Sequence, residues 1–226
     1  MTGSAGSSDQ GSIRLARLPP GRHGLPREFV TRNQQDRLAA GTISAVAERG
    51  FNETTITQIC AAAGVSRRTF YTYFSSKEEC YLAAGRTIVE HLRIAAEASS
   101  PEEREWPMRV KAKLRATLEF LAVNPDLARF VLIAPQRAGK EVTSRYRSIL
   151  EGAVEYLCEG RPSGDEQRTP SDAVAASLIG GMVALIVRQV EEGNGARLPE
   201  LLPDLVELFL TPYLGRVDAV RIAHSE

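Results

Sequence analysis

The chain has 226 residues, and its 28 Lys and Arg balance its 28 Asp and Glu, so the formal net charge is zero. This length permits one large or two small domains with a buried core. A neutral chain is unlike an architectural protein that compacts DNA, which would be basic overall. The charge is nevertheless uneven, because residues 1–78 carry ten Lys and Arg against six Asp and Glu and the remainder is acidic. This asymmetry is typical of a nucleic-acid-binding module joined to a different domain.

Motifs of catalysis and of metal binding are missing from the sequence. Three separate cysteines, Cys60, Cys80 and Cys158, fit neither a disulfide framework nor a metal site. There is no Gly-x-Ser-x-Gly elbow, Walker loop or His-Glu-x-x-His motif, so we expect no enzyme, no cofactor and no metal. An all-α enzyme that uses scattered carboxylates stays open as an alternative. No apolar signal segment and no apolar run of the ~20 residues that span a membrane is found, which predicts a cytoplasmic protein without a membrane partner.

The first 26 residues differ in composition from the rest of the chain. Residues 1–26 are rich in Gly, Ser and Pro and include several arginines, so we expect a disordered, basic arm. From Arg27 on, apolar residues recur with helical spacing, and no hairpin signal is found. The prediction is an all-α fold of about nine helices. A three-helix helix-turn-helix domain is expected over residues 27–76, and a helical effector-binding and dimerisation domain over residues 77–226.

The first domain contains the local signals of a helix-turn-helix. A first helix over residues 27–49 is expected to end at Gly50. Thr55 and Gln58 then form a capping box that begins a second helix. The other signals are an inward apolar stripe, a glycine and a capping serine at the turn, and two inward aromatic residues of a third helix: Ile56, Ile59, Cys60, Ala63, Gly64, Ser66, Phe70 and Phe74.

Six further helices are predicted after the helix-turn-helix. The first of them begins at Ser75, which forms a capping box with Glu78, and continues to about Ser99. Thr169 is expected to cap a later helix, with Pro170 at its first helical position. The remaining helices are expected at about 107–123, 126–133, 141–159, 170–192 and 199–214. The last two are apolar on nearly all sides, so they must be covered on more than one side.

A stretch without acidic residues coincides with the third helix. No Asp or Glu lies between Glu53 and Glu78, whereas Arg67, Arg68 and Lys77 lie within this stretch. Two arginines in the first turn are unfavourable for an isolated helix, because a helix N-terminus is already partly positive. An anionic partner is therefore expected there. The outward face of the helix offers donors for phosphates and base edges, and it carries Arg68, Thr69, Tyr71 and Thr72.

These residues resemble a known family. The run from Ile56 to Ala84 is similar to the DNA-binding segment of TetR-family repressors, in which a Gly-aromatic pair, here Gly50–Phe51, ends the first helix. The resemblance implies a homodimer whose third helices enter successive major grooves of a palindromic operator in double-stranded DNA. Together with the outward face, it implies contacts to phosphates or base edges at Thr55, Thr57, Arg67, Arg68, Thr69, Tyr71, Thr72, Tyr73 and Lys77. Gly41 departs from the family pattern and is expected to cost the first helix about 1 kcal/mol.

For the C-terminal domain, the resemblance implies an effector pocket among its first four helices and a dimeric bundle formed by the helices at 170–192 and 199–214. Small residues at Ser177, Gly180 and Gly181 permit close helix approach in such a dimer. The pocket is predicted from aromatic residues and one methionine, namely Trp106, Phe120, Phe130, Tyr146 and Met182. An apolar or amphipathic small molecule is the expected effector. The predicted function is a repressor that this ligand releases from its operator, with a constitutive DNA-binding dimer as the alternative.

Overall fold

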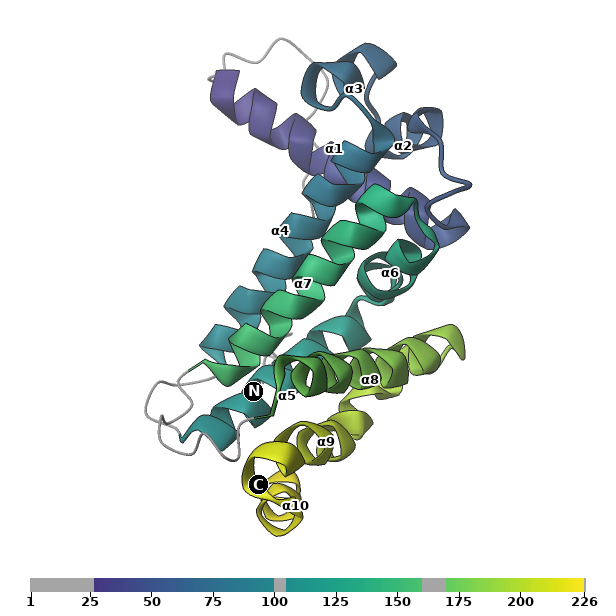
Figure 1. Cartoon of the computed structure of the whole chain (residues 1–226). Helices are drawn as coiled ribbons and strands as arrows, with labels where there is room; N and C mark the ends of the chain where they lie inside the picture. Colours follow the sequence, from purple (N-terminus) through teal and green to yellow (C-terminus); the bar gives the residue numbers. More distant parts are fainter. Residues whose placement is uncertain (1–26, 100–104, 160–169, 226) are drawn as a thin grey trace, which may run out of the picture.

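The computed structural model describes residues 27–99, 105–159 and 170–225, with side chains from residue 33 onward. The expected arm at residues 1–26 lies outside this part. All regular structure within the described ranges is helical, which confirms the all-α prediction (Figure 1). The α-helices are α1 (Arg27–Arg49), α2 (Ile56–Ala63), α3 (Arg67–Tyr73), α4 (Lys77–Ala98), α5 (Trp106–Val123), α6 (Pro125–Ala128), α7 (Lys140–Cys158), α8 (Asp172–Glu191), α9 (Leu202–Leu214) and α10 (Arg216–Ala223).

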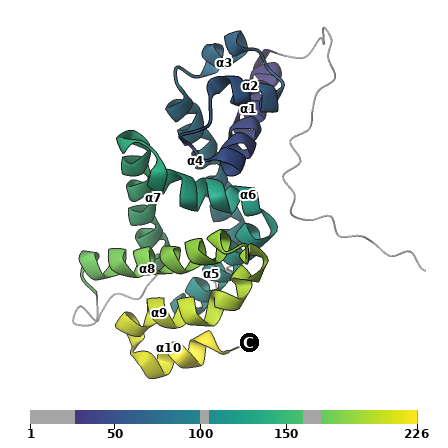
Figure 2. The ribbon, with the colours of Figure 1, turned by 90° about the vertical axis from the view of Figure 1, so that its right-hand side faces the viewer.

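The helices form two ends joined by a long middle section. Helices α1, α2 and α3 lie at one end, and α8, α9 and α10 lie at the other (Figure 1, Figure 2). Helix α4 runs from the first end along the molecule and packs against α1, α5 and α7. One apolar cluster lies within α1–α3 and the start of α4, and the largest lies among α5, α7, α8, α9 and α10. A third cluster, the middle cluster, joins α1 and the loop after it to α4, α6 and α7, so the two ends share a core.

Two helices begin later than their sequence signals predict. Helix α4 is capped by Ser76 rather than by Ser75, because the Ser76 hydroxyl accepts a bond from the Glu79 backbone N–H at 3.1 Å. The carboxylate of Glu79 in turn accepts from the Ser75 backbone N–H at 2.7 Å. Two adjacent serines and two adjacent glutamates allow two capping registers, and the second one forms. Helix α8 is capped by Ser171, so the predicted start at Pro170 is wrong, and Thr169 lies outside the described residues.

The segment expected as one helix over residues 126–133 divides into part of α6 and a π-helix. Helix α6 has only four residues and continues as a π-helix over Arg129–Ile133 and a 3₁₀ turn over Ala134–Arg137. A second 3₁₀ segment, Gly195–Leu201, precedes α9, so that helix starts later than predicted. Helix α10 was not predicted. It follows Gly215, whose positive φ of 82° turns the chain, and it packs back on α9.

Gly41 has a role that helix propensity alone does not reveal. A Cβ atom at this position would lie 2.6 Å from the backbone N and 2.8 Å from the Cβ of Ala63 on α2. Such distances are far inside van der Waals contact, so α1 and α2 cross backbone to backbone here. The expected weakening of α1 is therefore offset by a close helix–helix contact that no other residue type permits.

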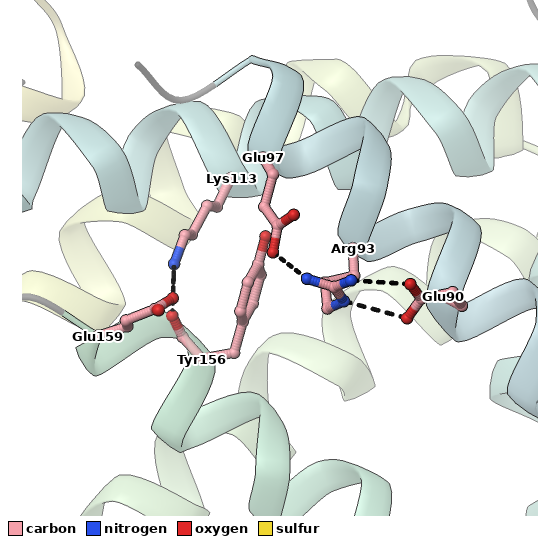
Figure 3. Close-up of polar contacts among 6 residues, drawn as sticks. All are labelled: Glu90, Arg93, Glu97, Lys113, Tyr156 and Glu159. Carbon is pink, nitrogen blue, oxygen red and sulfur yellow. Dashed lines mark hydrogen bonds and ion pairs between the residues drawn. The ribbon is translucent and has the colours of Figure 1, made fainter. Parts of the chain in front are cut away.

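Two buried lysines of α5 bind the C-terminal ends of other helices. The Lys111 ammonium donates to the Ile222 carbonyl at the end of α10 at 2.9 Å and to the carbonyl of Ser225. The Lys113 ammonium donates to the Tyr156 carbonyl at 2.7 Å and to the Glu159 carboxylate at 3.1 Å, both near the end of α7 (Figure 3). A helix C-terminus is partly negative and leaves carbonyls without partners, which accounts for both contacts.

Candidate functional site

The helix-turn-helix begins with the capping box predicted for α2. The Thr55 hydroxyl accepts from the Gln58 backbone N–H at 3.3 Å, and the Gln58 side chain accepts from the Thr55 backbone N–H at 2.8 Å. At the other end of α2, Gly64 has the left-handed φ of 63° that the turn requires. The inward stripe also forms, since Ile59, Cys60 and Ala63 are buried and Ile56 packs beside them. Local signals therefore fix the first half of the motif.

Helix α3 is held by one cap and two aromatic residues. The Ser66 hydroxyl accepts from the Thr69 backbone N–H at 3.0 Å. Phe70 is fully buried and Phe74 is 9% exposed, with ring centroids 5.9 Å apart. With these rings inward, the opposite side of the helix is open to solvent and carries Arg67, Arg68, Tyr71 and Thr72, which we call the α3 face. Tyr71 is 51% exposed, so its ring is accessible on the α3 face.

Several of the predicted DNA contacts have partners within the protein. The Tyr73 hydroxyl donates to the Gln34 side chain of α1 at 3.0 Å, so this half-buried residue holds α3 against α1. The Thr69 hydroxyl shares a hydrogen bond of 2.9 Å with Ser66, and the Thr72 hydroxyl donates to the Arg68 carbonyl at 3.0 Å. Thr57 and Thr55 are exposed on α2 and at its cap. The structure thus brings Thr55, Thr57 and the α3 face to one end of the molecule, and turns Tyr73 toward α1.

Lys77 occupies a position different from the one expected. Its ammonium donates to the carbonyls of Phe51 at 2.7 Å and Thr54 at 2.9 Å, with Asn52 at 3.4 Å. It also lies 4.3 Å from the centre of the Phe51 ring. A lysine has three N–H donors, and these contacts occupy them. The structure therefore assigns Lys77 to closing the α1–α2 loop, and a bond to a phosphate would replace one of these contacts.

Arg37 was missed by sequence reasoning. Its guanidinium donates to the carbonyls of Ala63 at 3.0 Å and Gly64 at 2.5 Å. These carbonyls lie at the C-terminal end of α2, where a helix leaves its carbonyls without partners of its own. The donor is 26 residues away along the chain, so no local spacing marks it. Arg37 and Gly41 lie one turn apart on α1 and both contact the end of α2, which fixes the position of the turn before α3.

Tyr81 links the DNA-binding end to the rest of the molecule. This buried residue of α4 donates its hydroxyl to the Phe130 carbonyl in the π-helix at 2.6 Å. The centre of its ring lies 4.3 Å from the centre of the Phe130 ring and 5.0 Å from the centre of the Phe51 ring. The rings of Tyr81 and Phe51 meet edge to face. Burial raises the pKa of the Tyr81 hydroxyl, so it remains a donor at neutral pH. A single side chain thus contacts both the loop after α1 and the segment after α6.

A small apolar cavity lies beside Tyr81, between α4, the π-helix and α7. The cavity is about 50 Å³ and is lined by Tyr81, Leu82, Gly85, Val89, Phe130, Val131, Pro135, Val142, Tyr146 and Ile149. Across Tyr146 a groove of about 350 Å³ lies between α7 and α8. The Tyr146 hydroxyl is buried and has no hydrogen-bond partner among the described residues, and burial raises its pKa. Tyr146 therefore lines both the cavity and the groove, and its hydroxyl is a polar group without a partner in the described part of the chain.

The five predicted pocket residues do not come together. Phe130 and Tyr146 line the cavity between α4 and α7. Phe120 packs between the two larger apolar clusters. Trp106 donates its indole N–H to the Leu157 carbonyl at 2.9 Å, and Met182 is buried in the C-terminal core. Aromatic residues on these helices thus serve both core and cavity, which composition does not distinguish.

Helix α8 carries more apolar surface than the single chain covers. By length and composition alone its 20 residues suffice to cross a membrane, and 28% of its apolar window is buried within the described structure. One face packs on the core through Ala175, Ile179, Met182, Ile186 and Val190. The other face exposes Val174 and small residues such as Ser177, Gly180 and Ala184. A helix with a covered face and an open apolar face needs a further partner.

Comparisons with known proteins agree with this arrangement. Residues 38–84 match the model of the bacterial regulatory proteins of the tetR family. The chain is 30% identical over 107 residues to the nucleoid occlusion factor SlmA of Haemophilus ducreyi, covering 47% of this chain and 53% of that protein. Similar solved folds include the fatty acid degradation regulator FadR of Bacillus halodurans, at 18% identity and a TM-score of 0.69, covering 80% of this chain and 95% of that one.

Another similar fold is FadR of Bacillus subtilis in complex with stearoyl-CoA, at 18% identity and a TM-score of 0.66, covering 80% of this chain and 98% of that one. The family model covers the helix-turn-helix, and the solved folds extend the likeness to the C-terminal helices. Over residues 38–84 the chain thus matches the tetR family, and beyond them the likeness to these solved structures is a likeness of fold.

Proposed function

We propose that this chain is a transcriptional regulator of the TetR family. In this proposal it is a cytoplasmic, homodimeric repressor that binds a palindromic operator and is released by an amphipathic ligand with an apolar chain. The observation that carries the proposal is the position of Tyr81, which lines the cavity between α4 and α7 and contacts Phe51 at the DNA-binding end. A ligand that moves this side chain changes contacts at both ends. A regulator of this kind needs no catalytic group.

The DNA-binding part of the proposal rests on the α3 face. Arg67 and Arg68 are exposed, lie in the first turn of α3 and have no acidic residue in that turn. A guanidinium suits both phosphates and the O6 and N7 atoms of guanine. We propose that Arg68 and Tyr71 read base edges, and that Thr55, Thr57, Arg67, Thr69 and Thr72 contribute further contacts to bases or phosphates.

The dimer part of the proposal rests on α8 and α9. The open apolar face of α8 runs beside half-buried residues of α9 such as Leu208. A Cβ atom at Gly181 would lie 3.8 Å from the Leu208 side chain. Two copies that pair these helices bury both faces in a four-helix bundle. Such a dimer presents two α3 faces, as a palindrome requires.

The ligand part of the proposal rests on the two spaces beside Tyr146. At about 50 Å³ the inner cavity is smaller than the ~150 Å³ that holds a benzene molecule, so an apolar chain must displace Tyr146 to pass from the groove into the cavity. Polar residues also line the groove, namely Gln136, Arg188 and Glu191, which suit a polar head group. The stearoyl-CoA in complex with the similar FadR of Bacillus subtilis supports an acyl thioester as this ligand.

Helix α4 is long enough to connect the proposed ligand site with the helix-turn-helix. Its 22 residues correspond to a rod of ~33 Å at 1.5 Å per residue. A chain that enters beside Tyr81 and Gly85 displaces this rod from α7 near its DNA-binding end. Operator half-sites one helical turn apart, ~34 Å, tolerate little change in the spacing of the α3 helices. Ligand and operator must then weaken each other equally, by ~1.4 kcal/mol for each tenfold change.

The experiment uses an operator duplex selected from random sequences by the full-length protein. Stearoyl-CoA is titrated into the labelled complex and anisotropy reports release, with coenzyme A alone as the control. We expect stearoyl-CoA to weaken operator binding at least about tenfold and coenzyme A to leave it unchanged. Gly85→Leu, which fills the cavity, should abolish this response, whereas Gly152→Leu on the exposed side of α7 should keep it. An operator affinity that no acyl-CoA alters would favour the constitutive dimer.

A further inference from the structure

A large hollow lies at the junction of the two domains. It is about 690 Å³ and is lined by residues of α1, α4 and the turn between α5 and α6. Its α1 residues, Asp36, Ala39, Ala40, Ile43 and Ser44, fall on one helix face, and so do its α4 residues, Ala84, Thr87, Ile88 and His91. We call this space the junction groove. It shares no lining residue with the cavity between α4 and α7.

The junction groove has an apolar floor and an acidic rim. Ala84, Ile88 and Leu127 form the buried floor, and Ile43 packs against them. Val123 at the rim is 67% exposed, which leaves an apolar side chain in contact with water beside the floor. This combination of concave shape and apolar lining is typical of a small-molecule site.

The charges at the rim select the kind of ligand. Asp36 approaches from α1 and Asp126 from the start of α6, so two carboxylates line the same space. Within the described part of the chain neither forms an ion pair, and no Lys or Arg lines the groove. The neighbouring Arg37 is turned away, toward the end of α2. The electrostatic potential in the groove therefore favours a cation and opposes an anion.

We propose that the junction groove binds an amphipathic monocation, in which an ammonium group is joined to a short apolar chain. This second ligand site is distinct from the cavity between α4 and α7, which we call the effector cavity. The chain covers Val123 and the floor, which removes apolar surface from water. The ammonium lies between the carboxylates of Asp36 and Asp126. Because the ligand contacts α1 on one side and α4 and α6 on the other, it bridges the DNA-binding domain and the C-terminal domain.

The test compares three probes that share an octyl chain and differ in head-group charge: octyltrimethylammonium, octanol and octanoate. Calorimetric titration of the full-length protein should show one octyltrimethylammonium per chain. Octanol should bind about tenfold more weakly and octanoate more weakly still, since the cation gains ~1.4 kcal/mol or more from the two carboxylates. Equal binding of all three probes would show that charge plays no part and would overturn the proposal, as would no binding of the cation.

Variants locate the site. Asp36→Asn with Asp126→Asn should lower the affinity for octyltrimethylammonium to that for octanol. A matched pair, Asp172→Asn with Asp204→Asn, makes the same change in net charge at exposed residues in the first turns of α8 and α9 and should leave the affinity unchanged. Ser44→Trp, at an exposed position of the rim, should block the groove and abolish binding in a protein that melts normally.

Two further outcomes distinguish the junction groove from other places where the cation could bind. Gly85→Leu, which fills the effector cavity, should leave octyltrimethylammonium binding intact. This test of the junction groove therefore does not depend on whether the proposed acyl-CoA response is observed. If Gly85→Leu abolishes binding of the cation, the probe occupies the effector cavity and the junction groove proposal fails. If Ser44→Trp changes the sedimentation coefficient, the groove is a contact between copies of the chain and the proposal also fails.

Discussion

The two halves of this molecule are packed in different ways. In the DNA-binding domain, α1 meets α2 backbone to backbone at Gly41, and Arg37, Lys77 and the caps of α2 and α3 bind main-chain atoms directly. Around α4 and α7, the packing instead leaves a cavity, a π-helix and two buried tyrosine hydroxyls, those of Tyr146 and Tyr156, without partners in the described part of the chain.

This difference suits the proposed function, in which one surface stays constant while another adjusts. Contacts to backbone atoms leave little freedom to the α3 face, because main-chain positions shift only when whole helices move. The side chains that line a cavity lack neighbours on one side, so fewer contacts are lost when they shift. Tyr81 lies at the border and packs against both Phe51 and Phe130. Substitutions on either side of this border should therefore have different signatures.

The largest effect on stability is expected at Gly41. Gly41→Ala should lower the free energy of unfolding by about 1–3 kcal/mol, because the new methyl group would overlap the backbone of Ala63. Gly152→Ala is the matched control, since a Cβ there meets nothing within 4 Å. It should raise stability by about 0.5–1 kcal/mol, as alanine does in an open helix position. Chemical denaturation measures both, and opposite signs would confirm the tight packing. A stabilising Gly41→Ala would show that α1 and α2 are not in close contact.

A loss of DNA affinity without loss of stability is expected on the α3 face. Arg68→Ala should weaken operator binding by about 1–3 kcal/mol if the side chain reads a base. The melting temperature should stay unchanged, because Arg68 is exposed and its side chain has no partner in the described structure. Arg145→Ala, an exposed arginine on α7, serves as the control. Normal operator binding by Arg68→Ala in an anisotropy titration would place the recognition surface elsewhere.

Lys77 tests whether the stability of the helix-turn-helix depends on the loop between α1 and α2. Lys77→Met should lower the free energy of unfolding by about 1–2 kcal/mol, because the carbonyls of Phe51 and Thr54 lose a charged donor. Operator affinity should fall with it. If Lys77 bound only a phosphate, the variant would melt like the parent and would reduce the salt dependence of operator binding by about one counterion. Thermal melts and a salt titration together decide between these roles.

A smaller effect is expected for the hydroxyl of Tyr81. Tyr81→Phe keeps the rings in place but removes the donor to the Phe130 carbonyl, which should cost about 0.5–1.5 kcal/mol of stability. The more informative quantity is the coupling free energy between stearoyl-CoA and operator. We expect it to decrease in Tyr81→Phe while the affinity of free protein for the operator changes little. Unchanged coupling would mean that the signal bypasses this residue.

The smallest effect concerns the cap of α4. Hydrogen bonds from Ser75 hold the pKa of the Glu79 carboxyl below its ordinary value of 4.5. A lowered pKa in the folded state means that this contact stabilises the fold above about pH 4.5 and that the stabilisation is lost as the pH falls. Ser75→Ala should therefore make the stability slightly less sensitive to acidification below that pH. Melting temperatures from pH 7 to pH 3 measure this, and identical profiles for variant and parent would exclude the contribution.

Sequence reasoning succeeded where structure is determined by neighbours along the chain. The cap at Thr55, the turn at Gly64 and the inward Phe70 follow from residues within one or two helical turns. The register of the α4 cap was wrong by one residue because Ser75 and Ser76 satisfy the same local rule. Helix α10 was missed because Pro212 and Gly215 together resemble a helix end, although Pro212 lies inside α9.

Long-range contacts account for the remaining differences. The roles of Lys77 and Arg37 depend on carbonyls 23 to 27 residues away, which no spacing rule reveals. Gly41 was interpreted through helix propensity alone, whereas its neighbour is Ala63 on another helix. The predicted pocket residues divided between core and cavity for the same reason. The side chains that bind DNA were placed by local pattern and family resemblance, and their contacts stay predictions.

The π-helix over Arg129–Ile133 has a consequence for how such proteins diverge. A π turn contains one residue more than an α turn, so it is equivalent to a single-residue insertion within a helix. Deleting that residue would restore α geometry and rotate the side chains that follow within the same helical segment, which ends at Arg137, by about 100°. A change in length of one residue at this point would thus alter the wall of the cavity between α4 and α7 while leaving the α3 face untouched. Related regulators that differ in effector but share their operator are expected to differ in length here.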